Sequence, residues 1–182
     1  MAAAIENLMV THAGTDLEAL FRAHHARVLQ AAYRVTGSMA DAEDAAQCVF
    51  LRLVRRDVDP RRITHFESYL RRSAVNAALD LLRARRNREA VPVEAADTLN
   101  ATSAMSPERV LSSSEIRDQL RCALASLHPR AAEMFTLRYL EGLDNPEIAR
   151  LMDTSQAVVA VTLFRARAQL KKGLSGFRKG AL

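Results

Sequence analysis

Cysteine, glycine and tryptophan are scarce in this sequence of 182 residues, which has two Cys, six Gly and no Trp. Two cysteines are too few for a scaffold held together by disulfides. Cys48 and Cys122 have no Cys or His partner at the spacing of a zinc site, so we expect no bound metal and no cofactor. The scarcity of glycine, beside abundant Ala, Leu and Arg, favours helices.

Long apolar runs and a secretory leader are also missing. No stretch approaches the roughly 20 apolar residues that a membrane helix needs. The first residues lack the basic flank and the small-residue cleavage site of a signal peptide. We therefore expect a cytoplasmic protein with no membrane insertion. A composition of 49% hydrophobic and 26% charged residues is that of a globular chain and excludes complete disorder.

Positive charge is concentrated in particular segments. The chain has 26 Lys and Arg against 21 Asp and Glu, with a pI of about 9.8. Residues 61–90 alone hold 8 basic and 3 acidic side chains. This clustering is typical of a protein that binds a polyanion. On charge alone, a solvated helix face rich in arginine explains it equally well.

The spacing of apolar residues predicts an all-α fold without strands. The expected helices cover about 16–36, 41–56, 66–88, 112–127, 129–142, 145–152 and 155–172. The clearest buried stripe is Ala42, Ala45, Ala46, Val49, Phe50 and Leu53. Ile116 and Tyr139 are expected on the buried stripes of two later helices.

The segment 89–111 is polar, contains two prolines and shows no period, so we interpret it as a flexible linker. The sequence therefore predicts two small helical domains, 16–88 and 112–175, between an N-terminal tail (1–15) and a C-terminal tail (176–182).

Residues 145–164 have the spacing of a helix-turn-helix. Ala149 is small enough for a close helix crossing, Asp153 tolerates the turn, and Val159 is placed to anchor the second helix in a core. An ordinary helical hairpin has the same spacing. The second helix begins with a run of Ala and Val, so hydrogen bonds to bases would fall to Ser155, Gln156 and Thr162, helped by apolar contact with thymine methyl groups. Phosphate contacts are expected from Arg165, Arg167, Lys171 and Lys172.

The predicted helix 66–88 combines polar and arginine side chains. Asn76 and Asp80 lie one turn apart in its middle. Arginines flank them on both sides: Arg71, Arg72, Arg83, Arg85, Arg86 and Arg88. This pattern suits single-stranded DNA, because an unpaired base exposes its whole hydrogen-bonding edge. Phe66 or Tyr69 could stack on such a base, although aromatics at this spacing are more often core residues.

Three segments resemble bacterial sigma factors of the sigma-70 family. DAEDAAQCVFLRL (41–53) is similar to the polymerase-binding helix of region 2. FESYLRRSAVNAALDLLRARRNR (66–88) is similar to the promoter-melting part of that region. LHPRAAEMFTLRYLEGLDNPEIARLMDTS (127–155) is similar to the start of region 4. Two regions and a short linker are typical of the extracytoplasmic-function group.

The resemblance implies an alternative sigma factor that is not an enzyme and has no catalytic residues. Its partners would be core RNA polymerase, through the β′ clamp and the β flap, promoter DNA and an anti-sigma factor. The implied polymerase-binding residues are Asp41, Asp44, Gln47, Phe50 and Leu53. The implied −10 residues are Arg71, Arg72, Asn76, Asp80, Arg83, Arg85 and Arg86. The implied −35 residues are Ser155, Gln156, Thr162, Arg165, Arg167 and Lys171.

Other functions fit the sequence less well. A stand-alone helix-turn-helix regulator would leave the region 2 motifs unexplained and would need a dimerisation helix, and none is evident. An enzyme acting on nucleic acid would need clustered carboxylates or a His-metal site, whereas the five histidines are scattered. Redox sensing by Cys48 is disfavoured because we expect that thiol to be buried in an apolar stripe.

Overall fold

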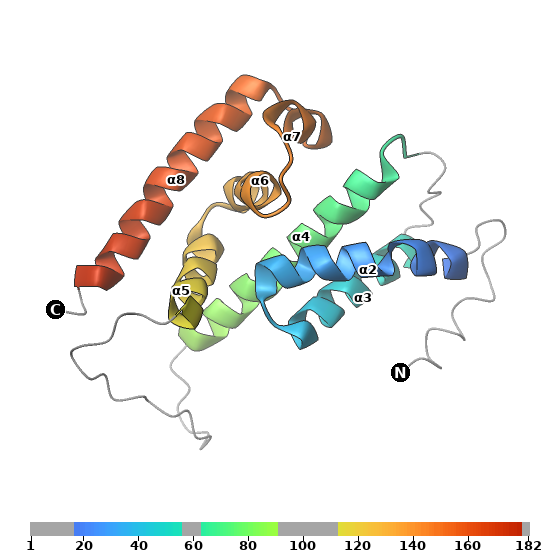
Figure 1. Ribbon diagram of the computed structural model, residues 1–182, viewed down its shortest axis with the longest axis horizontal. Coiled ribbons are helices and arrows are strands. Elements are labelled where there is room, and N and C mark those ends of the chain that lie inside the picture. The colour runs from blue at the N-terminus through green and yellow to red at the C-terminus, as the bar shows by residue number, and fades with distance from the viewer. Residues whose placement is uncertain (1–16, 56–62, 91–112, 180–182) are drawn as a thin grey trace, which may run out of the picture. The chain divides into compact units, whose positions relative to one another are not determined.

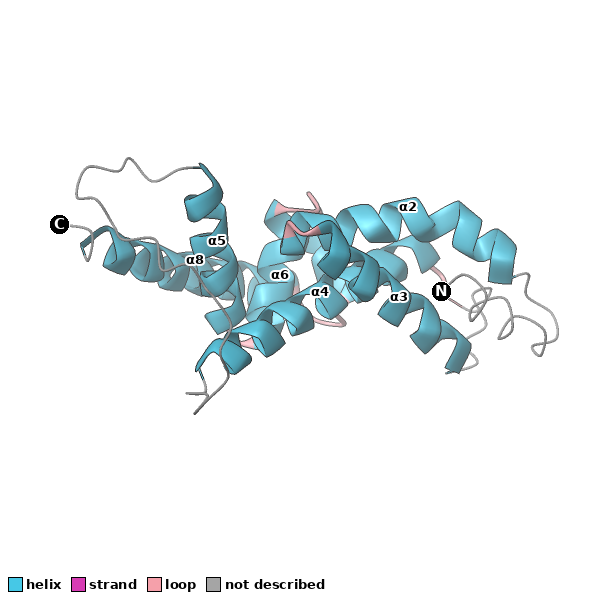
Figure 2. Ribbon diagram, turned by 90° about the horizontal axis from the view of Figure 1, so that it is seen from below, coloured by secondary structure: helices cyan, strands magenta, loops and turns pink. Residues whose placement is uncertain are grey.

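The computed structural model describes residues 17–55, 63–90 and 113–179, and these ranges are helices joined by short turns (Figures 1 and 2). The helices are α2 (Leu17–Thr36), α3 (Met39–Arg55), α4 (Phe66–Ala90), α5 (Ser113–Ser126), α6 (Pro129–Tyr139), α7 (Asn145–Leu151) and α8 (Gln156–Lys179). No strand occurs in the described ranges. The predicted all-α fold is confirmed.

The described helices belong to two compact units, divided between Ala78 and Leu79 inside α4. Two predicted features lie outside the described residues: the N-terminal tail and the linker from residue 91 onward. The first two residues of the predicted linker are instead the last two of α4. The domain limits 16–88 and 112–175 stay a prediction.

In the first unit, α2 and α3 form a helical hairpin. Gly37 ends α2 at a φ of 65°, a conformation that costs glycine little because it has no Cβ. Ser38 then caps α3, since its Oγ accepts a hydrogen bond from the Asp41 amide at 3.3 Å. All six apolar residues predicted for the stripe of α3 are buried. The ring of Phe21 meets that of Phe50 at a centroid distance of 4.8 Å.

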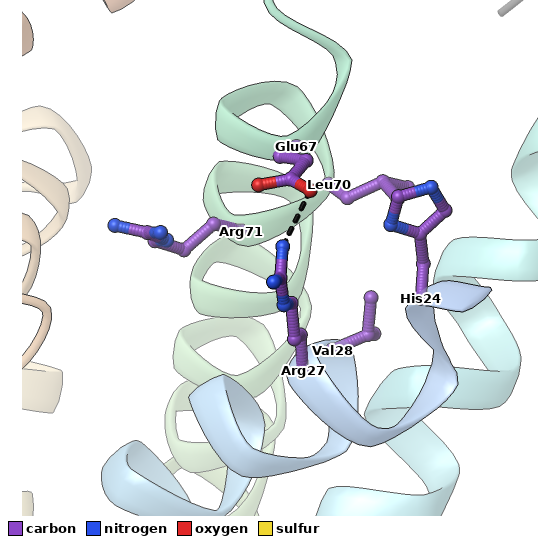
Figure 3. Close-up of a pocket in the computed structure, with 6 residues that line it drawn as sticks. All are labelled: His24, Arg27, Val28, Glu67, Leu70 and Arg71. Atoms are coloured by element: carbon purple, nitrogen blue, oxygen red, sulfur yellow. Dashed lines mark ion pairs between the residues drawn. The ribbon is translucent and has the colours of Figure 1, made fainter.

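The start of α4 packs against α2 in the same unit (Figure 3). Glu67 pairs with Arg27 of α2, both largely exposed. Beside this pair the imidazole of His24 meets the edge of Phe66 at 5.4 Å. Val28 and Leu70 are buried beneath them. Because an exposed ion pair adds at most about 1 kcal/mol, the apolar contacts hold this end of α4 in place.

In the second unit, α8 packs against α5, α6 and α7. Figure 1 shows it as the long helix in orange and red, with α7 at its N-terminal end. The buried side of α8 consists of Val159, Leu163, Ala166 and Leu170, spaced by three and four residues. The other large buried side chains of this core include Leu124, Met134, Leu137 and Ile148.

Several sequence predictions are wrong. Ile116 and Tyr139 were expected on buried stripes, yet both are exposed. Tyr139 lies at the surface because its ring is covered only in part, by Phe135 at 4.6 Å and by the guanidinium of Arg167 at 5.9 Å. Cys48 is exposed rather than buried, since it lies on the side of α3 opposite the apolar stripe. That removes the burial argument against a redox role.

Candidate polymerase and nucleic-acid interfaces

The helix-turn-helix of the second unit begins with a capping box at α7. The Asp144 carboxylate accepts a hydrogen bond from the Glu147 amide at 2.7 Å. The Glu147 carboxylate accepts one from the Asp144 amide, also at 2.7 Å. Pro146 stands in the first turn, where a missing N–H costs nothing. A helix of seven residues cannot hold itself in water, so this cap and the packing of α7 maintain it.

We expect Asp144→Ala to lower the free energy of unfolding by about 1 kcal/mol, because the Glu147 amide at the start of α7 loses its side-chain acceptor. Thermal or urea unfolding of the purified chain measures the change. Asp144→Asn keeps an acceptor at the cap and should restore most of the loss. If both variants unfold like the parent, the capping box contributes nothing to stability.

The turn between α7 and α8 has the geometry predicted from its spacing. Asp153 adopts a φ of 49°, so the predicted turn position is confirmed. Ala149 is buried at the helix crossing, and Val159 is fully buried at the start of α8. The Arg130 guanidinium donates to the Met152 carbonyl at 3.2 Å, which ties α6 to the end of α7. The two helices of the motif are therefore held together by packing at Ala149 and Val159, and the hydrogen bond from Arg130 holds α7 against α6.

The predicted −35 residues lie along α8 and at its cap. Ser155 accepts a hydrogen bond from the Val158 amide at 3.2 Å, so its hydroxyl oxygen serves as the helix cap. Gln156 is exposed, and Thr162 is half-buried. Arg165, Arg167 and Lys171 are exposed along the following turns. The guanidinium of Arg167 lies over the Tyr139 ring, which holds this cation close to α6.

The predicted polymerase-binding residues divide into two groups on α3. Asp44 and Gln47 are exposed and Asp41 is half-buried, so a partner that docks on this helix can contact them. Phe50 and Leu53 are buried in the core of the first unit. These two side chains can support the docking surface, but a rigid partner does not reach them.

The predicted −10 residues occupy α4. Arg71, Arg72 and Asn76 are half-buried, whereas Asp80, Arg85 and Arg86 are exposed. Asp80 and Arg83 form an ion pair at 3.1 Å one turn apart.

A hollow between α3 and α4 gathers polar side chains around Asn76. It is lined by Val49, Arg52, Tyr69, Arg72, Ser73 and Asn76. Asn76 and Arg72 are site residues predicted from the sequence, and Tyr69 was a candidate for stacking, whereas Arg52 and Ser73 were not predicted. The spacing of Tyr69, Ser73 and Asn76, at i, i+4 and i+7, is the signal that could have found the serine. The hollow combines an aromatic ring, hydrogen-bonding groups and two guanidinium groups, which suits a nucleotide.

Two features important to other classes of function are not found in the described residues. No group of three or more His, Cys, Asp or Glu side chains there is arranged to hold a metal ion. None of the helices in the described part of the chain is long and apolar enough to cross a membrane.

Comparison with known proteins identifies the family. The family model "Sigma-70 region 2" matches residues 20–88, and "Sigma-70, region 4" matches residues 117–170. The "ECF RNA polymerase sigma-E factor" of Escherichia coli is 32% identical over 134 residues, covering 70% of each chain. The chain belongs to the sigma-70 family, in its extracytoplasmic-function group.

Two further matches show how much of this ECF sigma factor is shared with known proteins. The "ECF RNA polymerase sigma factor SigE" of Mycolicibacterium smegmatis is 36% identical over 159 residues. That match covers 86% of this chain but only 60% of the relative. The solved structure of CnrH in complex with the cytosolic domain of CnrY has a TM-score of 0.51 and 22% identity, and the match covers 88% of both chains. This structural likeness shows a shared fold.

Proposed function

We propose that this chain is an alternative sigma factor, which binds core RNA polymerase, recognises −10 and −35 promoter DNA and opens the duplex to start transcription. The observation that carries the proposal is the presence of both sigma regions in one chain, in the order 2 then 4. A stand-alone helix-turn-helix regulator would need only region 4. The chain supplies promoter choice and strand opening, and the polymerase supplies the chemistry, so the chain has no catalytic residues or cofactor of its own.

Each interface has a separate role in this proposal. The exposed residues of α3 dock on the β′ clamp, while the second unit contacts the β flap and, through α8, the −35 element. The hollow beside Asn76 captures a base that leaves the −10 duplex, which offsets part of the cost of melting. Two weak DNA contacts in one chain raise each other's effective concentration. An anti-sigma partner would cover these surfaces, and the complex would act in the cytoplasm.

Run-off transcription with purified core polymerase tests the proposal. On fragments of the source genome we expect specific transcripts with the chain present and none without it. Asp44→Arg should weaken binding to core polymerase by about ten-fold or more, because it reverses an exposed charge on the docking helix. Asp118→Arg, the same reversal on an exposed carboxylate of α5, is the matched control. Duplex DNA binding without polymerase binding or transcripts would instead identify a stand-alone regulator.

A further inference from the structure

The outward side of α8 in the helix-turn-helix is apolar. Val158, Val161 and Phe164 are 46%, 49% and 69% exposed, and Ala157 and Ala160 are exposed beside them. Ala157, Val161 and Phe164 follow one another at spacings of four and three, so they share one side of the helix. The buried residues Val159 and Leu163 lie on the opposite side. Apolar side chains gathered on an exposed surface mark an interaction site.

This apolar side is the one that a helix-turn-helix presents to the major groove. The second helix of the motif enters the groove with its N-terminal residues toward the base edges. Few polar side chains on it are available for bases. The Ser155 oxygen caps the helix, and Thr162 is half-buried, which leaves Gln156 as the exposed polar side chain of the first two turns of α8.

The charge of α8 favours DNA over an apolar protein groove as the occupant. Residues 156–179 contain no Asp or Glu. Arg165, Arg167, Lys171 and Lys172 are all exposed in the two turns that follow the apolar stretch. Arg165 lies one turn beyond Val161 on the same side. An apolar patch followed by exposed cations on the same helix matches the major groove, where base edges lie between two phosphate backbones.

Thymine is the base that presents an apolar group in the major groove, its C5-methyl. We propose that α8 recognises the −35 element through thymine methyl groups, with Val161 and Phe164 as the residues that determine specificity. This inference rests on the proposed function and adds the chemical class of the sequence that the second unit recognises. The −35 element is therefore rich in thymine where it faces these two side chains.

Deoxyuridine is the probe, because it differs from thymidine only by the missing methyl group. Promoters are first selected from a random duplex library with core polymerase and the full chain. Each thymidine of the selected −35 element is then replaced by deoxyuridine, and the affinity of the polymerase complex is measured. We expect a loss of about four-fold for each methyl group in contact. With Val161→Ala the loss at one position should disappear.

Ile116→Ala is the matched control, since it shortens a β-branched side chain that is 50% exposed on α5. This variant should keep the full deoxyuridine penalty. Val161 is exposed and alanine favours helices, so Val161→Ala should fold, which a circular dichroism melt verifies.

Three outcomes would overturn the inference: a selected −35 element without thymine, equal affinity for thymidine and deoxyuridine, or a penalty that Val161→Ala leaves unchanged. If Val161→Ala no longer assembles with core polymerase and deoxyuridine has no effect on affinity, the apolar side of α8 binds a protein partner. That result would also overturn the inference. If no promoter is selected with polymerase, the proposed function fails. The same deoxyuridine series with the chain alone on selected duplex DNA then decides the inference separately.

Discussion

Asn76→Ala should reduce promoter opening by about ten- to a hundred-fold while leaving the affinity for core polymerase unchanged. The amide of asparagine both donates and accepts, and hydrogen bonds of this kind to a base contribute roughly 1–3 kcal/mol. Asn76 lines the hollow between α3 and α4, whereas the exposed residues of α3 that we assign to polymerase docking do not line it. Permanganate reactivity of the melted strand measures opening, and fluorescence anisotropy with labelled protein measures polymerase affinity.

Two further variants sharpen this test. Asn87→Ala makes the same change at an exposed position near the end of α4 and should have little effect. Asn76→Asp keeps the size of the side chain but removes its donor, so it should change which base is preferred at the captured position. A parallel loss of polymerase affinity and opening in Asn76→Ala, with a lower melting temperature, would show that the residue supports the fold instead.

The helices could be predicted from the sequence where only one side of the helix is buried. The six apolar residues expected to be buried on α3 are the six that the structure buries, because a strong period of 3.6 residues leaves one solution for the core side. The helix-turn-helix was predictable for a related reason. Its spacing follows from a close crossing at Ala149, a turn at Asp153 and an anchor at Val159, and each of these has a local signal.

Other features depend on tertiary contacts that have no local signal. The last helix was expected to end near residue 172, yet α8 continues to Lys179. α5 packs against α8 at this point, since a Cβ added at Gly173 would lie in ordinary van der Waals contact, 4.0 Å from the Cβ of Ala123. The hollow around Asn76 needs Arg52 from another helix, and the partial cover of the Tyr139 ring depends on Arg167 of α8. No period within one helix predicts either pairing.

Ile148→Ala should lower the stability of the second unit by about 2–5 kcal/mol, the usual cost of a cavity at a fully buried aliphatic site. The effect should be local. Ile148 is the fully buried side chain of α7, and that short helix depends on packing. Hydrogen exchange followed by mass spectrometry on the full chain measures each helix separately. We expect faster exchange in α7 and the first half of α8, with α2 and α3 unchanged.

Ile116→Ala is the matched control, because it makes the same substitution at a half-exposed position of the same unit. It should cost less than about 1 kcal/mol, since little apolar area is lost and no cavity forms. Equal loss of protection in α2 and α3 on Ile148→Ala would contradict the expectation and show that the two units unfold together. Loss of protection from exchange confined to α7 and α8 would mean that the two units unfold independently. That result would agree with the separate roles proposed for the two sigma regions. Promoters that depend on the −35 contact should then lose activity first, while docking through α3 persists.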